Sequence, residues 1–207
     1  MASLKDLIVV TNRYWVWGAP IILVSVILDQ VTKAMVLGNS VFNAQNCLFA
    51  PASQCGRIEI SNIFDLSMVW NYGMSFGMLQ SEGLGRWLLL LTSLAIAVGF
   101  LIWMLQAERV LTALSLSLVV GGAIGNIIDR ARFGAVVDFL DFSGPWFGVR
   151  FPAESGLFAW IDRTLFHPDG LLGLGFPYVF NVADVCVSVG AVLLLADRVL
   201  AGRKSSG

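Results

Sequence analysis

Two aspartates, Asp138 and Asp184, are the residues of this chain best suited to chemistry. Each lies beside a long apolar run, Asp138 in GAVVDF and Asp184 in FNVAD. Two carboxylates held close together cannot both ionise easily, so one stays protonated while the other acts as a base. Such a pair can activate water and protonate a leaving amine, which is aspartic-peptidase chemistry. A proton-coupled membrane transporter would use the same buried carboxylates, and the residues alone leave both readings open.

No other pattern in the sequence competes for a catalytic role. The single histidine, His167, and the three scattered cysteines lack metal-ligand spacing, and no serine, cysteine or histidine cluster indicates a nucleophile. The sequence has no phosphate-binding or dinucleotide-binding glycine motif and no nucleophile elbow. We therefore expect no metal and no cofactor. The net charge of -1 argues against a nucleic-acid partner.

The composition indicates an integral membrane protein. Hydrophobic residues make up 57% of the 207 residues and charged residues 13%, and the mean hydropathy is +0.79. A soluble domain of this size cannot bury that much apolar surface. A membrane-spanning helix needs about 20 mostly apolar residues. Four segments qualify and predict an all-α membrane protein, with 1–207 as one domain and spans at about 14–37, 86–106, 109–128 and 181–199.

The distribution of basic residues predicts the topology. Lysines and arginines precede the first span, occupy the short link between the second and third, and follow the fourth, at Lys5, Arg13, Arg109, Arg198, Arg203 and Lys204. The positive-inside rule makes these regions, and hence both termini, cytoplasmic. Segments 38–85 and 131–180 then lie outside. Asp138 and Asp184 fall at the extracytoplasmic face, at the mouths of the third and fourth spans.

The two outer segments carry their own patterns. Residues 57–78 mix β-branched and aromatic residues with turn glycines, which predicts a few short strands. Residues 154–166 place apolar side chains near helical spacing, so they form either a short helix in the membrane interface or a buried turn of a loop. The many glycines and prolines in 143–179 predict that much of this segment is loop. Cys47 and Cys55 pair if the outer compartment is oxidising, and otherwise stay free thiols.

Several polar residues lie at membrane depth beside the candidate acids. Asp29 and Lys33 are four residues apart on one helix face, and a structural role is the favoured reading. Asn126 and Arg130 also share a face and suggest a polar pocket at the helix mouth. Asp129 is better explained as marking the interfacial end of the third span.

Two further features concern how the helices begin and pack. Gly121 and Gly125 have the spacing that lets another helix approach closely. Asn181 is a good N-cap for the fourth span, which puts Asp184 at the third helical position, where the helix dipole favours its charge.

The chain resembles the lipoprotein signal peptidases, also called signal peptidase II, which are bacterial inner-membrane aspartic endopeptidases. The resemblance rests on blocks that occur in family order: LDQVTK (28–33), NYGMSFGML (71–79), GGAIGNIIDR (121–130), GAVVDF (134–139) and FNVAD (180–184). It extends from about residue 20 to 200. It implies four membrane helices, a small extracytoplasmic β-cradle and an interfacial helix over the site.

The resemblance also implies a reaction and roles for residues. The family removes the signal peptide from prolipoproteins, cutting before a cysteine that carries diacylglycerol, and globomycin blocks its catalytic pair. Here the catalytic pair would be Asp138 and Asp184. Family residues that contact the substrate or support the acids match Asn71, Gly73, Phe76, Asn126, Arg130 and Asn181. Asp29, Lys33 and Asp129 match structural polar positions.

One departure from the family pattern is the long connection between the catalytic blocks. Residues 140–179 are longer than usual and contain the Gly/Pro-rich insertion. Long connections need not keep the acids apart, because loop length costs little free energy. We expect the insertion to stay on the outer surface and to tune access to the site.

Overall fold

The computed structural model describes residues 14–42, 55–61, 63–73, 84–142, 150–152, 171–173 and 178–205. These residues form two compact units. The first takes the described residues within Met1–Thr32, Asn71–Val136 and Val182–Gly207, and the second those within Lys33–Trp70 and Val137–Asn181. The first unit is largely helical and the second holds most of a small sheet. That the two act as one domain stays a prediction.

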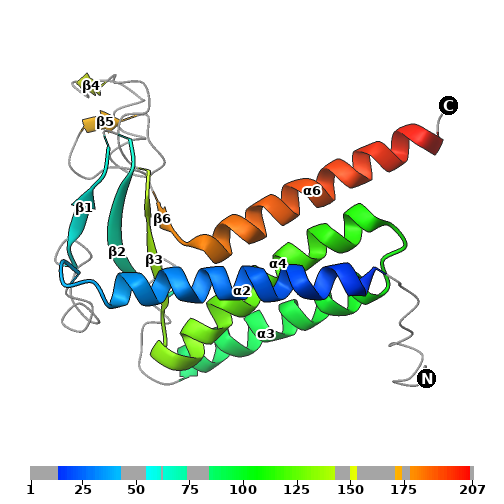
Figure 1. Cartoon of the computed structure of the whole chain (residues 1–207), viewed down its shortest axis with the longest axis horizontal. Helices are drawn as coiled ribbons and strands as arrows, with labels where there is room; N and C mark the ends of the chain where they lie inside the picture. Colours follow the sequence, from blue (N-terminus) through cyan, green and yellow to red (C-terminus); the bar gives the residue numbers. More distant parts are fainter. Residues whose placement is uncertain are drawn as a thin grey trace. The chain divides into compact units, whose positions relative to one another are not determined.

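Four long helices occupy the four segments predicted to span. Their bounds are α2 Trp15–Leu37, α3 Leu84–Leu105, α4 Val110–Phe133 and α6 Val182–Ser205 (Figure 1). Within the described residues, three segments are long and apolar enough to cross a membrane: α2, α4 and residues Gly85–Leu105 of α3. α6 has 24 residues, but its crossing stays a prediction.

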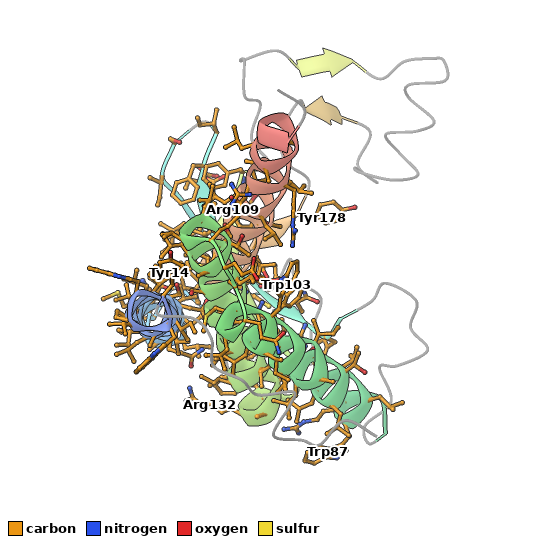
Figure 2. The ribbon with its side chains drawn as sticks, turned by 90° about the vertical axis from the view of Figure 1, so that its right-hand side faces the viewer. Tyr14, Trp87, Trp103, Arg109, Arg132 and Tyr178 are labelled. Carbon is orange, nitrogen blue, oxygen red and sulfur yellow. The ribbon has the colours of Figure 1, made fainter. Side chains whose placement is uncertain are left out.

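In the first unit α4 is the central helix, packed against α3 and α6 (Figure 2). Its neighbour α2 turns small and polar residues inward, among them Gly18, Ser25 and Asp29, while Leu23 and Ile27 lie exposed. This is the reverse of a soluble helix, which buries its apolar stripe. The reversed pattern fits a helix whose outer solvent is lipid.

Glycines on α4 allow the close approach that their spacing predicts. A Cβ added at Gly121 would lie 2.7 Å from Cβ of Ser25 on α2, and one at Gly125 would collide with Oδ2 of Asp29. Gly122, which the sequence did not single out, faces α6, where a Cβ would collide with the carbonyl oxygen of Ala183. The predicted close helix contact is confirmed, and α4 makes it with α2 and with α6.

The sheet has the strand order β1-β2-β3-β6, with β1 Arg57–Glu59, β2 Asp65–Asn71, β3 Val136–Asp141 and β6 Val179–Phe180 (Figure 1). β1 pairs antiparallel with β2, and β3 with β6. The rings of Phe64 and Phe180 each lie against Phe142, with centroids 4.6 and 5.7 Å apart respectively. β1 and β2 confirm the strands predicted within 57–78.

The structure gives the end of the third helix and the local structure around Asp138. α4 continues to Phe133, beyond the predicted end near 128, and Gly134 then closes the helix in the left-handed region with φ 78°. Asp129 suggested the end of the span, but the helix continues one more turn, in which the basic residues Arg130 and Arg132 stabilise the helix dipole. Asp138 consequently lies in the middle of β3, not at a helix mouth.

Other expectations fall outside the described residues. These are the short helix within 154–166, Cys47 with its predicted disulfide, and Phe76. Most of 143–179 lies outside as well, although two short strands within it, β4 Arg150–Pro152 and β5 Leu171–Gly173, pair antiparallel.

Candidate active site

Asp184 is the third residue of α6 and receives a hydrogen bond from α4. α6 begins at Val182, directly after Asn181, which places Asp184 in its first turn as predicted. The side-chain amide of Asn126 donates from Nδ2 to Oδ1 of Asp184 at 2.8 Å. A hydrogen bond to an ionised carboxylate is stronger than one between neutral groups. The structure therefore brings together two of the residues singled out from the sequence.

A buried polar network lies at the same end of α6. Asp29 is 0% exposed, and its Oδ1 accepts a hydrogen bond from the backbone N–H of Ala183 at 2.9 Å. Nε2 of Gln30 lies 3.2 Å from Oδ2 of Asp29 and 3.0 Å from Oδ1 of Asp129. Asp129 is 1% exposed, so its carboxylate lies inside the helical unit, and its place at the interfacial end of the span stays a prediction. The network joins α2, α4 and the start of α6.

In the second unit, Asp138 also accepts a hydrogen bond from an asparagine side chain. Asp138 is buried on β3, and its neighbours along the strand, Val137 and Phe139, are buried as well. Nδ2 of Asn181 donates to Oδ1 of Asp138 at 2.7 Å, and both side chains are buried. Each candidate acid thus has an amide donor that fixes one carboxyl oxygen. Asp138 and Asp184 belong to different units, and their pairing stays a prediction.

Arg57, Asp65 and Asp141 have partners within the sheet. Arg57 forms an ion pair with Asp65, and the hydrogen bond between them raises the pKa of the Arg57 guanidinium above its ordinary value. Asp141, three residues after Asp138, accepts a hydrogen bond from Oγ of Ser67 at 2.6 Å. These contacts tie β1 to β2 and connect β2 with β3.

Asn71, Gly73, Arg130 and Lys33 are the remaining predicted site residues within the described part of the chain. Oδ1 of Asn71 accepts the backbone N–H of Gly73 at 2.9 Å, and Gly73 has φ 77°, which favours glycine. Arg130 lies in the last turn of α4. Lys33 is buried. The substrate-binding and structural roles of these residues stay predictions.

Two features escaped the sequence reasoning. Gln30 was not recognised as the link between Asp29 and Asp129, because an uncharged residue in a span carries little signal. Asp197 is 1% exposed in α6, pairs with Nη2 of Arg109 at 2.9 Å and accepts from Oγ1 of Thr112 at 2.5 Å. The rule that intramembrane carboxylates need a partner would have identified Asp197.

Comparisons with known proteins identify the family of this chain. The family described as "Signal peptidase (SPase) II" matches residues 21–200. A "Lipoprotein signal peptidase" of Caulobacter vibrioides is 35% identical, covering 92% of this chain and 90% of the relative. One of Methylorubrum extorquens is 37% identical, over 87% and 84%. The transporter alternative is not favoured.

A solved structure described as a "bacterial membrane enzyme" shares the fold. It is 21% identical with a TM-score of 0.59, and the match covers 88% of this chain and 87% of that one. At that identity the likeness speaks for the fold, and membership rests on the family match and the close relatives. The chain is a bacterial membrane protein and belongs to the signal peptidase II family.

Proposed function

We propose that this protein is an aspartic endopeptidase that removes the signal peptide from prolipoproteins and cuts before a diacylglyceryl-modified cysteine. Removal of signal peptides from prolipoproteins follows from membership of the family and from the relatives' names. The observation that carries the aspartic mechanism is that Asp138 and Asp184 each accept an asparagine N–H, from Asn181 and Asn126 respectively.

Chain connectivity supports pairing of the two acids. Asn181, which holds Asp138 by its side chain, stands three residues before Asp184 in the sequence. Three residues span at most about 11 Å even when fully extended. The covalent chain therefore keeps Asn181, the hydrogen-bond partner of Asp138, close to Asp184. This holds whatever the length of the connection 140–179.

The proposed reaction divides the work between the two carboxyl groups. The ionised one takes a proton from water as the water oxygen attacks the scissile carbonyl carbon, and the protonated one supplies a proton to the leaving amine as the C–N bond breaks. Asn126 and Asn181 hold the two carboxyl planes during these transfers. An apolar surrounding that excludes water strengthens the hydrogen bonds from the two asparagines to the carboxyl groups.

The proposed substrate site extends from these acids into the membrane. Asn71, Gly73, Phe76, Asn126 and Arg130 would hold the peptide, and the lipid chains and signal helix would remain in the bilayer. The proposed topology has four spans, cytoplasmic termini, and the acids at the extracytoplasmic face of the inner membrane. The sheet would then form the extracytoplasmic cradle, and globomycin would compete with the substrate.

Cleavage in purified form tests this proposal. The wild-type protein in detergent is given a diacylglyceryl-modified prolipoprotein and the same precursor without lipid, and product masses are measured. We expect one cut, directly before the lipidated cysteine, only in the modified precursor, and inhibition by globomycin. Failure of a folded wild-type protein to cleave the modified precursor would refute the proposal.

A further inference from the structure

We propose that Asp29 is a positioning residue for Asp184, which it orients by capping α6 from the neighbouring helix α2. The inference rests on the proposed function, because it assigns Asp184 a catalytic role. Asp29 lies 154 residues before Ala183 in the sequence, yet its Oδ1 accepts the Ala183 N–H at 2.9 Å in the buried interior of the first unit.

The contact performs the task of an N-cap. The first N–H groups of a helix have no partner within it, and a side-chain oxygen usually satisfies the second or third of them. α6 begins at Val182, so Ala183 is its second residue. Asn181 immediately before the helix donates its side-chain amide to Asp138. Asp29 supplies the acceptor for Ala183 from α2, and its negative charge favours the positive end of the helix dipole.

Asp29 is itself held in place on two sides. Nε2 of Gln30 reaches its Oδ2 at 3.2 Å and also reaches the carbonyl oxygen of Gly125 at 3.3 Å. Gly125 leaves space for the carboxylate, since a Cβ there would collide with Oδ2 and come within 3.3 Å of Cβ of Ala183. The carboxylate is therefore fixed between α2, α4 and the start of α6.

The consequence for catalysis comes from adjacency. Ala183 and Asp184 are neighbours in the same helical turn. If Ala183 loses its acceptor, that turn frays or takes up a buried water, and Asp184 moves relative to Asn126. A misplacement of about 1 Å in a catalytic group can cost about 100-fold in rate. Asp29 then affects kcat without touching the substrate.

Three variants test the inference on the full-length protein in detergent. Asp29→Leu removes the acceptor while keeping a similar shape. Asp29→Asn keeps an oxygen acceptor, and asparagine and aspartate are equally good caps. Asp197→Leu is the matched control, since it removes a buried carboxylate from α6 itself, 13 residues beyond Asp184.

The expected result separates positioning from stability. Asp29→Leu lowers kcat about 10- to 100-fold with KM nearly unchanged, at a temperature where the variant is fully folded. Asp29→Asn restores most of the rate. Asp197→Leu lowers Tm but leaves kcat unchanged. Unchanged kcat in folded Asp29→Leu would overturn the inference. If that variant does not fold, Asp29→Glu, which displaces the carboxylate by one methylene, must be slower than Asp29→Asn, and equal rates would overturn it.

Amide hydrogen exchange at Ala183 distinguishes failure of this inference from failure of the proposed function. Exchange does not depend on any substrate. We expect it to be faster in Asp29→Leu than in wild type, and close to wild type in Asp29→Asn. Unchanged protection in Asp29→Leu overturns the capping. If Asp29→Leu loses protection while the folded wild-type protein cleaves no prolipoprotein, the capping is supported and the proposed function is refuted.

Discussion

Asn126 donates a hydrogen bond from Nδ2 to Oδ1 of Asp184 at 2.8 Å. The bond joins α4 to the first turn of α6, and Asn126 is 58 residues from its partner. An asparagine at a lipid-facing position would be costly, because amide groups have few partners in hydrocarbon. The hydrogen bond to Asp184 satisfies this amide and places it beside a candidate catalytic acid.

Removal of this donor is expected to slow cleavage without unfolding the protein. A hydrogen bond to a charged group contributes about 1.5–3 kcal/mol, which corresponds to about 10- to 150-fold in rate if the bond is needed in the transition state. Asn126→Leu should lower kcat/KM by that factor in a prolipoprotein cleavage assay.

Ser117→Ala provides the control on the same helix. Ser117 is buried and its hydroxyl donates to the Ala113 carbonyl one turn away, at 2.7 Å. Its loss should leave cleavage unchanged. Equal rates for Asn126→Leu and Ser117→Ala would contradict a role for the Asn126 bond.

The close approach of α4 and α2 predicts different outcomes at two glycines. Gly125→Ala places a Cβ against the Asp29 carboxylate, whereas a Cβ at Gly99 on α3 meets nothing within 4 Å. Overpacking costs about 1–3 kcal/mol, and alanine is favoured over glycine within helices. Thermal unfolding in detergent should show a lower Tm for Gly125→Ala and no loss for Gly99→Ala. A similar Tm in both variants would mean that the helices do not depend on this approach.

The ion pair at the far end of α6 should contribute to stability and not to chemistry. Arg109 contacts both the carboxylate and the backbone carbonyl of Asp197, each at 2.9 Å. Arg109→Gln leaves a buried carboxylate without its cation. Because the Arg109 side chain is 42% exposed, we expect a moderate loss of about 1–3 kcal/mol, measured as a lower Tm with kcat unchanged.

A double variant checks the partnership. Asp197→Asn removes the charge that Arg109 neutralises, so Arg109→Gln combined with Asp197→Asn should be less destabilised than the sum of the single changes. Strict additivity of the two changes in unfolding free energy would show that the pair contributes nothing.

Much of the helical fold could be predicted because lipid imposes a simple requirement. A span must be long and apolar, and α2 and α3 begin and end within two residues of their predicted bounds. The predicted third span ended near residue 128, before the end of α4, because Asp129 was interpreted as interfacial. In the structure Asp129 is satisfied by Gln30 from another helix, a contact that one sequence cannot reveal.

The candidate residues come from the sequence and stay predictions, whereas the local structure around Asp138 differs from what the sequence suggested. Family motifs identify Asp138 and Asp184, but the run VVDFLD is as compatible with a helix end as with a strand. Pairing with β6, which follows almost 40 residues later in the chain, makes it a strand. The Asp29 cap of Ala183 was similarly out of reach, because a contact between residues 154 apart depends on tertiary packing.

The most direct test of the aspartic mechanism compares four asparagine substitutions in the same prolipoprotein cleavage assay. Asp138→Asn and Asp184→Asn remove the proposed acids. Asp141→Asn on β3 and Asp197→Asn on α6 remove buried carboxylates from the same elements. We predict that the first two lose cleavage by about 100-fold or more and still bind globomycin, while the other two cleave like wild type when folded. Cleavage at the wild-type rate by either Asp138→Asn or Asp184→Asn would contradict the catalytic pair.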